Sequence, residues 1–599
     1  MGDAGPCSPT LLTGPAGLPS ANPTKAFWQT SHPNPVAKHR STPGLPATAD
    51  IVVIGTGISG TFATHEILTT AAAAAGQALN VVVLEARTTC SAATGRNGGH
   101  CQPLVHAERP AIIDFEMRNY AHIRDLVKLH DVPCDFRQIP GVLGFWNKTY
   151  FDEAKAALQG SLVTAEHRKL VEVVEAPEEL QNLRLTGGVV GAIVQTVAAS
   201  LSPYKLMIWL WGEMIKEYER SEGGGGRWEG GGGWGGGGEW QGGRGGRGGW
   251  GGGGDWRGGG EWRGGRGGGG GSWEGGGGFG GGGEWDDGEG GGGRWGGGGG
   301  GGGQWRGGGE WGGETSKVTL NLQTETPVAS IQEVQGGHGW TVKTSRGEVH
   351  AKQVILATNA YTSHLMPEFE ALISPVQAQM SALLPPQGSP FRERLIPMSY
   401  GMMGVEGQDR VMSDYLVQNP ILDEDAGGVV GRGGHLMFGG GRAQARGNGV
   451  GVSDDDYVDP DAEAYLRSLP EHLNLEAEEE AGGAPQTTTG TGTSKSGLLD
   501  IAASWTGIIG SSADGHPWVG GVPGRDGLFV AAGYSGHGMT NAGLCGRHVA
   551  QLALKSLKGE DWKALQAHGV ELAEQGKGGV PREYVITQER IDAARGVRP

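Results

Sequence analysis

Cysteine is scarce in this sequence, and long apolar runs are absent from it. Only five of the 599 residues are cysteines, and none of them forms a C-x-x-C pair. This scarcity argues against a disulfide framework or a zinc site and favours a reducing compartment. The longest apolar candidate, residues 206–211, is far shorter than the roughly 18 residues of a membrane-spanning helix. The sequence therefore predicts no metal site and no membrane span.

Positive charge is also in deficit. The formal net charge is −17, from 48 Lys and Arg against 65 Asp and Glu. A diffuse acidic chain is a poor partner for nucleic acid or an anionic membrane. The first residues lack the charged and apolar regions of a secretory signal. We therefore expect a cytoplasmic protein. An organelle transit peptide stays open as an alternative, although residues 1–20 contain no arginine.

Glycine, by contrast, is abundant and unevenly distributed. Of 119 glycines, 58 lie in residues 222–314, together with 11 of the 19 tryptophans. Such a segment cannot bury a core, so we expect a long disordered insertion between a helix and a strand. Arg-Gly-Gly repeats with aromatics suit single-stranded nucleic acid, but the segment holds 8 Arg against 12 Asp and Glu. We favour a solvated insertion without a partner. The acidic and Thr/Gly-rich residues 476–496 are predicted to form a second surface loop.

A β-α-β unit follows the Pro-rich beginning of the chain. Residues 50–54 and 80–84 are β-branched runs typical of buried parallel strands. Between them lie Gly55-x-Gly57-x-x-Gly60 and a helical stretch. In a dinucleotide-binding turn these glycines allow a tight turn, close approach of a pyrophosphate and close helix–strand packing. Glu85, at the end of the second strand, would accept hydrogen bonds from ribose hydroxyls. The alternative is a tight turn without a ligand.

The loop after Glu85 indicates which dinucleotide is bound. Its sequence is Arg87-Thr-Thr-Cys-Ser91-Ala-Ala-Thr94-Gly95-Arg96-Asn97-Gly98-Gly99-His100. Small, hydroxyl-bearing and glycine residues would let the backbone pass close to a flavin and its diphosphate, which an NAD domain does not need. The motif Ser-x-x-Thr-Gly-Arg-Asn-Gly-Gly resembles the D-amino-acid oxidase-like (DAO) family of FAD-dependent oxidoreductases. The resemblance is nearest to the branch typified by gamma-glutamylputrescine oxidoreductase and its fungal relatives.

The carboxyl-terminal segment agrees with this resemblance. Trp505-Thr-Gly507-Ile-Ile-Gly510 is followed by Leu528-Phe-Val-Ala-Ala-Gly533-Tyr-Ser-Gly536-His537-Gly538-Met539-Thr540. We expect a strand over 528–532 and a helix starting near His537. Its first backbone N–H groups would face the flavin N1–C2=O edge, which is negative in reduced flavin. An ordinary helix start is the alternative.

The residues expected to contact FAD come from the two glycine turns and from the loop after Glu85. They also include Val328, which the resemblance places on the strand beside adenine and which on physical grounds alone is an apolar strand residue. They are Gly55, Gly57, Ile58, Ser59, Gly60, Glu85, Ala86, Arg87, Ser91, Thr94, Gly95, Arg96, Asn97, Gly98, Gly99, Val328, Gly533, Gly536, His537, Gly538, Met539 and Thr540.

The resemblance implies oxidation of the C–N bond of an amine or amino acid. Hydride would pass to flavin N5, the resulting imine would hydrolyse, and O2 or another acceptor would reoxidise the flavin. Candidate catalytic residues are Tyr415, Arg442 and His100. Each has a structural alternative: strand packing for Tyr415, an ion pair for Arg442, and a position merely flanking the flavin for His100. Covalent attachment of the flavin through His100 or Cys101 is a further alternative.

The predicted fold class is α/β, with a discontinuous Rossmann-type FAD-binding domain and an α+β substrate domain that has a mixed or antiparallel sheet. An extended arm covers residues 1–48 and a tail covers 576–599. The FAD-binding parts are 49–109, 191–221 with 315–375, and 501–575; the substrate parts are 110–190 and 376–500. A helix is expected to start at Ser202-Pro203, as N-cap and first residue.

Two other functions stay open at this point. One is an FAD dehydrogenase for a non-amine substrate such as a hydroxy acid or glycerol phosphate. The other is an interaction protein that uses the glycine-rich tract beside a degenerate flavin lobe.

Overall fold

The computed structural model describes residues 14–74, 78–106, 108–160, 163–219, 318–334, 336, 339–410, 412–420, 433–476 and 497–595. The tract 222–314, predicted to be disordered, lies outside the described residues, as does nearly all of the predicted loop 476–496.

The first sheet is largely parallel and corresponds to the predicted Rossmann-type domain. Its strand order is β16-β17-β10-β1-β2-β7, and the hairpin β8–β9 pairs with β10 through β9. Strands β17, β10, β1, β2 and β7 are mutually parallel, while β16 is antiparallel to β17. The bounds are β1 Thr48–Ile54, β2 Leu79–Leu84, β7 Val318–Gln323, β8 Val328–Glu333, β9 Trp340–Thr344, β10 Gly347–Leu356, β16 Trp518–Gly521 and β17 Leu528–Ala532.

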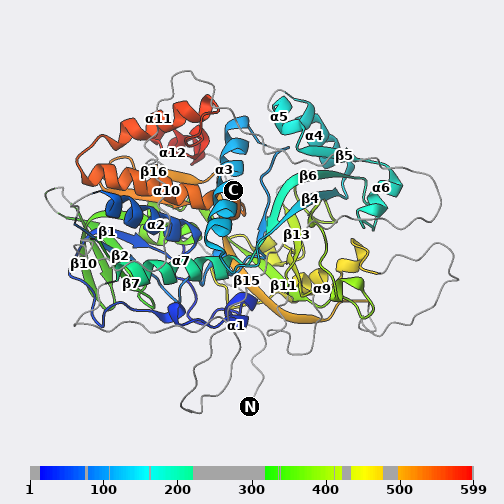
Figure 1. The fold of residues 1–599 in the computed structure, drawn as a ribbon, viewed down its shortest axis with the longest axis horizontal. Helices are drawn as coiled ribbons and strands as arrows, with labels where there is room; N and C mark the ends of the chain where they lie inside the picture. The colour runs from blue at the N-terminus through cyan, green and yellow to red at the C-terminus, as the bar shows by residue number, and fades with distance from the viewer. Residues whose placement is uncertain are drawn as a thin grey trace, which may run out of the picture. The chain divides into compact units, whose positions relative to one another are not determined.

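Both faces of this sheet are buried, which explains the continuous apolar runs of its strands. In β1, Ile51 and Val53 belong to the core formed with the helices, while Val52 and Ile54 belong to the core on the opposite face. Alternate side chains of a strand point to opposite faces. Figure 1 shows α2 and α10 lying along one side of β1, β2 and β10.

Two long helices cover that face and touch almost backbone to backbone. They are α2 (Ile58–Ala73) and α10 (Gly538–Leu557). A Cβ on Gly546 of α10 would fall 2.2 Å from the carbonyl oxygen of Ser59 in α2. Only glycine therefore allows this approach. Helices α3 (Pro110–His130) and α7 (Pro203–Tyr218) pack beside them.

The predicted start of α7 is confirmed. Ser202 is its N-cap, with the hydroxyl accepting the N–H of Lys205, and Pro203 is its first residue. The end of α7 also lies beside the first sheet, because Glu219 forms a parallel bridge with Leu320 of β7. The shorter helices are α1 Phe27–Ser31, α4 Lys148–Gln159, α5 Ala165–Arg168, α6 Pro177–Asn182, α8 Thr362–Leu365, α9 Pro460–Arg467, α11 Trp562–Glu574 and α12 Gln588–Ala594.

The second sheet is mixed, as predicted for the substrate domain. Its order is β15-β11-β14-β13-β12-β4-β6-β3, with β5 on β6, and only the β12–β4 pair is parallel. The bounds are β3 His100–Cys101, β4 Arg137–Phe145, β5 Val171–Val174, β6 Gly191–Ser200, β11 Ile373–Leu383, β12 Ser399–Met403, β13 Ser413–Gln418, β14 Leu436–Gly440 and β15 Ile501–Ser512.

The structure differs from the predicted division of the chain at three strands. Residues 191–200 and 501–512, assigned above to FAD-binding parts, form β6 and β15 of the second sheet. His100 and Cys101, at the end of the first FAD-binding part, also join that sheet as β3. These memberships depend on pairing between distant segments, and no turn signal in the sequence marks where the chain changes sheets.

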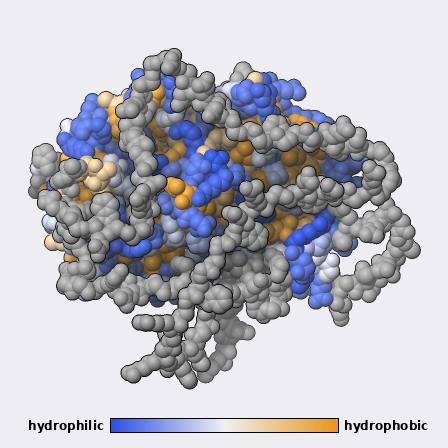
Figure 2. Space-filling view, in the orientation of Figure 1, coloured by the Kyte–Doolittle hydropathy of each residue, from blue (hydrophilic) through white to orange (hydrophobic). Residues whose placement is uncertain are grey.

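No helix of the described residues is long and apolar enough to cross a membrane. On the face drawn in Figure 2, hydrophilic and hydrophobic residues are interspersed. The large hydrophobic side chains exposed in the described part of the chain are scattered along the sequence: Leu18, Leu129, Val173, Val334 and Val450.

Candidate active site

A cavity of about 370 Å³ lies where the two sheets meet. Its walls include the starts of α2 and α10 from the first sheet's layer, and β11, β13 and β15 from the second sheet. Fifteen of the residues predicted to bind the cofactor line it: Gly55, Gly57, Ile58, Ser59, Glu85, Ala86, Thr94, Arg96, Asn97, Val328, Gly536, His537, Gly538, Met539 and Thr540. The structure thus brings the two glycine turns to one cavity.

The first turn, between β1 and α2, has the geometry for which its glycines were singled out. Gly55 has φ +106°, and a Cβ there would lie 2.6 Å from the carbonyl oxygen of Ala357. A Cβ on Gly60 would fall 1.9 Å from the carbonyl oxygen of Gly55. Gly60 therefore permits close packing of α2 on the turn and does not itself line the cavity.

Glu85 lies at the cavity but already accepts hydrogen bonds from the protein. Its Oε2 accepts from the backbone N–H of Thr56 at 3.0 Å and from the Thr56 hydroxyl at 2.5 Å. Its Oε1 accepts from the N–H of Arg87 at 3.0 Å. A carboxylate has about four acceptor positions, so Glu85 has about one left for a ribose hydroxyl.

The two arginines of the loop 87–100 bind the protein through a buried carboxylate. Arg87 donates both terminal nitrogens to Asp455, at 2.8 and 2.9 Å, and does not line the cavity. Arg96 lies 3.2 Å from the same carboxylate and donates to the carbonyl oxygens of Ser91 and Thr506. Their charges therefore hold the loop in place, a role that the sequence did not indicate.

Other predicted loop residues also lie behind the cavity wall. Ser91, Gly95, Gly98 and Gly99 of this loop, and Gly533 of the turn before α10, are not among the residues that line it. A Cβ on Gly95 would fall 1.9 Å from the carbonyl oxygen of Cys90, and one on Gly99 would fall 1.8 Å from that of Leu201. These two glycines thus serve close backbone packing.

The amino-terminal arm braces the same loop. Trp28 is fully buried, and its indole N–H donates to the carbonyl oxygen of Asn97 at 2.6 Å. Gln29 donates to the carbonyl oxygens of Ser91 and Gly95. The carbonyl oxygen of Thr24 accepts from Arg96 at 2.9 Å. In the sequence, Phe27-Trp28 is the apolar anchor expected to pin the arm to a lobe, but the sequence does not identify the loop 87–100 as its contact.

The second turn joins β17 to α10. Three elements hold it: the Asn359 side chain accepts the N–H of Gly533 at 3.0 Å, the Gly510 carbonyl of β15 accepts that of Ser535 at 2.8 Å, and the Tyr534 hydroxyl meets the Ser59 hydroxyl at 2.6 Å. Asn359 itself has φ +45°, a conformation that Asn tolerates better than most residues.

All three candidate catalytic residues line the cavity. The rings of His100 and Tyr415 stack, with centroids 5.6 Å apart and planes 29° apart. The Tyr415 hydroxyl accepts the N–H of Gly98 at 2.6 Å and donates to the sulfur of Met380 at 3.3 Å. Burial raises the pKa of Tyr415 to about 12, so its hydroxyl stays protonated.

His100 is neutral near pH 7. Burial, opposed in part by the hydrogen bond to Gln102 and aided by the nearby His537, lowers its pKa to about 4. Nε2 lies 3.0 Å from Gln102 Oε1. With Nε2 donating to that oxygen, Nδ1 is left as an acceptor.

A buried carboxylate, Asp414, accompanies these residues and was not predicted. It accepts from Tyr465 at 2.5 Å, from Gln408 at 2.7 Å and from the N–H of Gly441 at 3.0 Å. Burial raises its pKa to about 6, against these hydrogen bonds and the charge of Arg442. The only hydrogen bond found for Arg442 within the described residues is from Nε to the carbonyl oxygen of Asn448, at 3.4 Å. Burial lowers the pKa of Arg442, with Asp414 and Asp409 opposing.

The cavity suits a long dinucleotide that carries a flavin. Neither cap residue, Gly57 of α2 nor His537 of α10, accepts a helix N–H with its side chain. The N–H of Ile58 is instead accepted by Thr94 at 3.0 Å. Helix N-termini carry partial positive charge, so one start suits a diphosphate and the other a negative ring edge.

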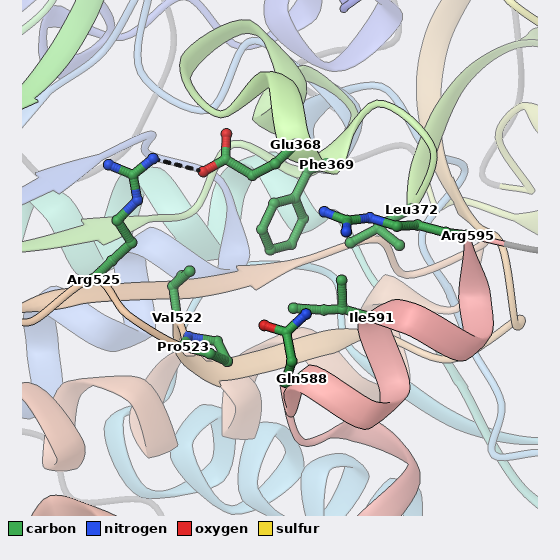
Figure 3. Close-up of a pocket in the computed structure, with 9 residues that line it drawn as sticks. All are labelled: Glu368, Phe369, Leu372, Val522, Pro523, Arg525, Gln588, Ile591 and Arg595. Atoms are coloured by element: carbon green, nitrogen blue, oxygen red, sulfur yellow. Dashed lines mark hydrogen bonds and ion pairs between the residues drawn. The ribbon is translucent and has the colours of Figure 1, made fainter.

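A second pocket, of about 210 Å³, lies away from this chemistry (Figure 3). It is lined by Phe369, Leu372 and Ile591, with Arg525 paired to Glu368 at 3.2 Å across its rim. None of the predicted site residues lines it. Among the described residues, no group of three or more His, Cys, Asp or Glu side chains is arranged to hold a metal ion.

Comparison with known proteins identifies the family to which the chain belongs. Residues 50–240 and 320–552 match the family model described as DAO, FAD dependent oxidoreductase. No curated protein matches the chain.

Solved structures give distant matches. The L-amino acid deaminase of Proteus vulgaris lacking its specific insertion sequence is 13% identical, covering 90% of this chain and 97% of its own, with a TM-score of 0.49. The glycine oxidase of Geobacillus kaustophilus is 14% identical, covering 86% and 96%, with a TM-score of 0.48. The L-proline dehydrogenase of P. horikoshii is 15% identical, covering 89% and 100%, with a TM-score of 0.47.

Proposed function

Because the chain belongs to the DAO family of FAD-dependent oxidoreductases, we propose that it oxidises the C–N bond of an amine or amino acid. Bound FAD supplies the two-electron acceptor. We propose that the parallel sheet with the starts of α2 and α10 holds FAD, through the cavity residues named above. The β11–β13–β15 side would hold the substrate.

One observation carries the substrate assignment. A neutral imidazole, a protonated phenol and a guanidinium line the same cavity as the start of α10. The stacked His100 and Tyr415 rings would form a flat wall against an apolar substrate carbon. His100 Nδ1, as an acceptor, suits an amine N–H, and a neutral amine is the form that can lose hydride.

Arg442 favours a carboxylate-bearing substrate within this class. Its two terminal nitrogens are the groups that could form a bidentate pair with a carboxylate. Asp414 contributes a compensating negative charge nearby. We therefore place amino acids ahead of simple amines.

Within the family, we propose kinship with the gamma-glutamylputrescine oxidoreductase branch and its fungal relatives, on the Ser91–Gly99 motif and the Gly533–Thr540 segment. The electron acceptor is O2 or another oxidant. A cytoplasmic location is part of the proposal, supported by the cysteines in the described part of the chain, which are buried and free: Cys90, Cys101, Cys134 and Cys545.

Anaerobic reduction of the bound flavin tests the proposal. Matched pairs of an amino acid and its 2-hydroxy acid would be compared, together with diamines and their N-acylated forms. We expect bleaching of the flavin band by one or more amino compounds and none by the hydroxy acids. Reduction by a hydroxy acid or glycerol phosphate alone would establish the alternative dehydrogenase.

The interaction-protein alternative is addressed by deleting residues 222–314. We expect flavin reduction to survive the deletion. Absence of turnover in the full chain, with loss of a partner on deletion, would favour that alternative.

A further inference from the structure

Tyr534 connects the two turns of the cavity directly. It lies between the end of β17 and the start of α10, with 6% of its surface exposed. Its hydroxyl lies 2.6 Å from the hydroxyl of Ser59, the second residue of α2, and Ser59 is 5% exposed. Both residues line the cavity. One buried hydrogen bond thus spans from the turn before one helix to the start of the other.

The partner of Tyr534 is itself fixed in place. Gly546 of α10 brings that helix against the backbone of Ser59, where a Cβ would fall 2.2 Å from the carbonyl oxygen. Ser59 is therefore held by α10 through its backbone and by Tyr534 through its side chain. Because Ser59 is held in this way, its hydrogen bond with Tyr534 restricts the position of the turn that carries Tyr534.

The other hydrogen bonds that hold the turn between β17 and α10 connect it to elements other than α2. The Asn359 side chain ties Gly533 to the residues after β10, and Ser535 is tied to Gly510 and Ser512 of β15. Among the described side chains around this turn, Tyr534 is the one that forms a hydrogen bond with α2. It therefore adds a side-chain link between the two helix starts to the backbone contact of Gly546 with Ser59.

We propose that Tyr534 is a positioning residue that, through Ser59, fixes the start of α10 relative to α2 and so sets how strongly the protein prefers reduced over oxidised FAD. This rests on the proposed placement of the flavin at α10 and the diphosphate at α2. The backbone N–H groups of Gly538, Met539 and Thr540 stabilise negative charge on the flavin only when they lie close to it. The effect of a helix terminus on a charge falls off within about one turn. Loosening that position weakens binding of the negative, reduced cofactor more than that of the oxidised one.

The test compares Tyr534→Phe, Ser59→Ala and the double variant with the wild-type protein. FAD dissociation constants and flavin midpoint potentials would be measured, the potentials by titration with a chemical reductant and reference dyes. We expect each single variant to bind FAD about fivefold to tenfold more weakly, as for loss of one buried hydrogen bond. We also expect about a tenfold smaller preference for reduced flavin, which lowers a two-electron midpoint potential by about 30 mV.

The double variant provides the sharpest outcome. If the two hydroxyls act only through each other, its potential will equal that of either single variant; additive shifts would overturn the proposal. Unchanged potentials in Tyr534→Phe and Ser59→Ala would also overturn it. Tyr120→Phe is the control, because that residue is also buried and its hydroxyl forms hydrogen bonds with Ala198 and Gln138, but it does not line the cavity.

This measurement separates the inference from the proposed function. Chemical reduction needs no substrate, so a potential shift is observable even if no amine reduces the enzyme. Conversely, amine oxidation with unaltered potentials would leave the proposed function standing and remove the role of Tyr534.

Discussion

Arg96 and Asp455 form an ion pair at 3.2 Å in which each side chain is only 1% exposed. They are separated by most of the chain, and the pair fastens the loop 87–100 to the residues that follow β14. Asp455 also receives both terminal nitrogens of Arg87. One carboxylate therefore pairs with two guanidinium groups.

Asp455→Asn should be strongly destabilising, because it removes the carboxylate that two largely buried guanidinium groups share. Removing one member of a buried ion pair typically costs about 3–5 kcal/mol. We expect a loss of that order in the free energy of unfolding by urea, together with loss of bound FAD. Asp456→Asn is the control; its side chain is exposed, so a change within about 0.5 kcal/mol is expected. Equal effects of the two substitutions would contradict the role given to Asp455.

Trp28 should matter to cofactor retention although it belongs to the arm. Trp28→Ala removes a fully buried ring and should cost about 3–5 kcal/mol of stability. Trp28→Phe keeps most of the packing but loses the hydrogen bond to Asn97. We expect the Phe variant to fold and to bind FAD several-fold more weakly in a fluorescence titration. Unaltered FAD affinity in that variant would show that the arm does not brace the loop.

Arg442 should discriminate between substrates with and without a carboxylate. Arg442→Gln is expected to lower kcat/KM for an amino acid by about 100-fold, as for a lost charge-assisted bidentate pair. The same substitution should change kcat/KM for an amine without a carboxylate by less than about threefold. Arg442→Lys, which keeps the charge but not the planar fork, should recover part of the loss. Equal losses for both substrates would assign Arg442 to structure.

Buried histidines should make the fold sensitive to acid. His548 of α10 has its pKa lowered to about 4 by burial, against about 6.5 in the unfolded chain. The folded state therefore binds fewer protons, so its stability is present above pH 6.5 and is lost as the pH falls towards 4. Between pH 7 and pH 5 this histidine alone should account for about 2 kcal/mol.

His548→Gln is the variant that isolates this effect. We expect the fall in unfolding free energy between pH 7 and pH 5 to be smaller than in the wild-type protein by about 2 kcal/mol. His568→Gln is the comparison, since that side chain is exposed. An unchanged pH dependence in His548→Gln would show that His548 is not a source of acid sensitivity.

Local patterns predicted the parts of the site that lie close together in the sequence. The strand 50–54, its three glycines and Glu85 needed only a window of about 35 residues, consistent with the size of a βαβ unit. Likewise, the predicted strand 528–532 coincides with β17, and α10 begins directly after His537. In such segments the spacing of the apolar residues and the positions of the glycines determine the backbone conformation, so distant residues are not needed to predict it.

The unpredicted parts depend on distant partners. Asp455 lies in a run of three aspartates, Asp454 to Asp456, which in sequence looks like a solvated surface. Its burial against Arg87 and Arg96 follows from the way the second sheet meets the first. Asp414 similarly looks like a polar residue at the end of a strand, yet Tyr465 and Gln408 enclose it. The membership of β6 and β15 in the second sheet is another long-range property.

The bridge between Glu219 and Leu320 determines where the chain can be shortened or divided without separating paired strands. These two residues flank a hundred positions of chain, yet they are neighbours in space. A linker of a few amino acids could therefore replace the residues between Glu219 and Leu320. If the chain were instead cut between these two residues, β7 would still pair with β2. The protein could in this way be expressed as two complementary polypeptides that meet along an existing sheet edge.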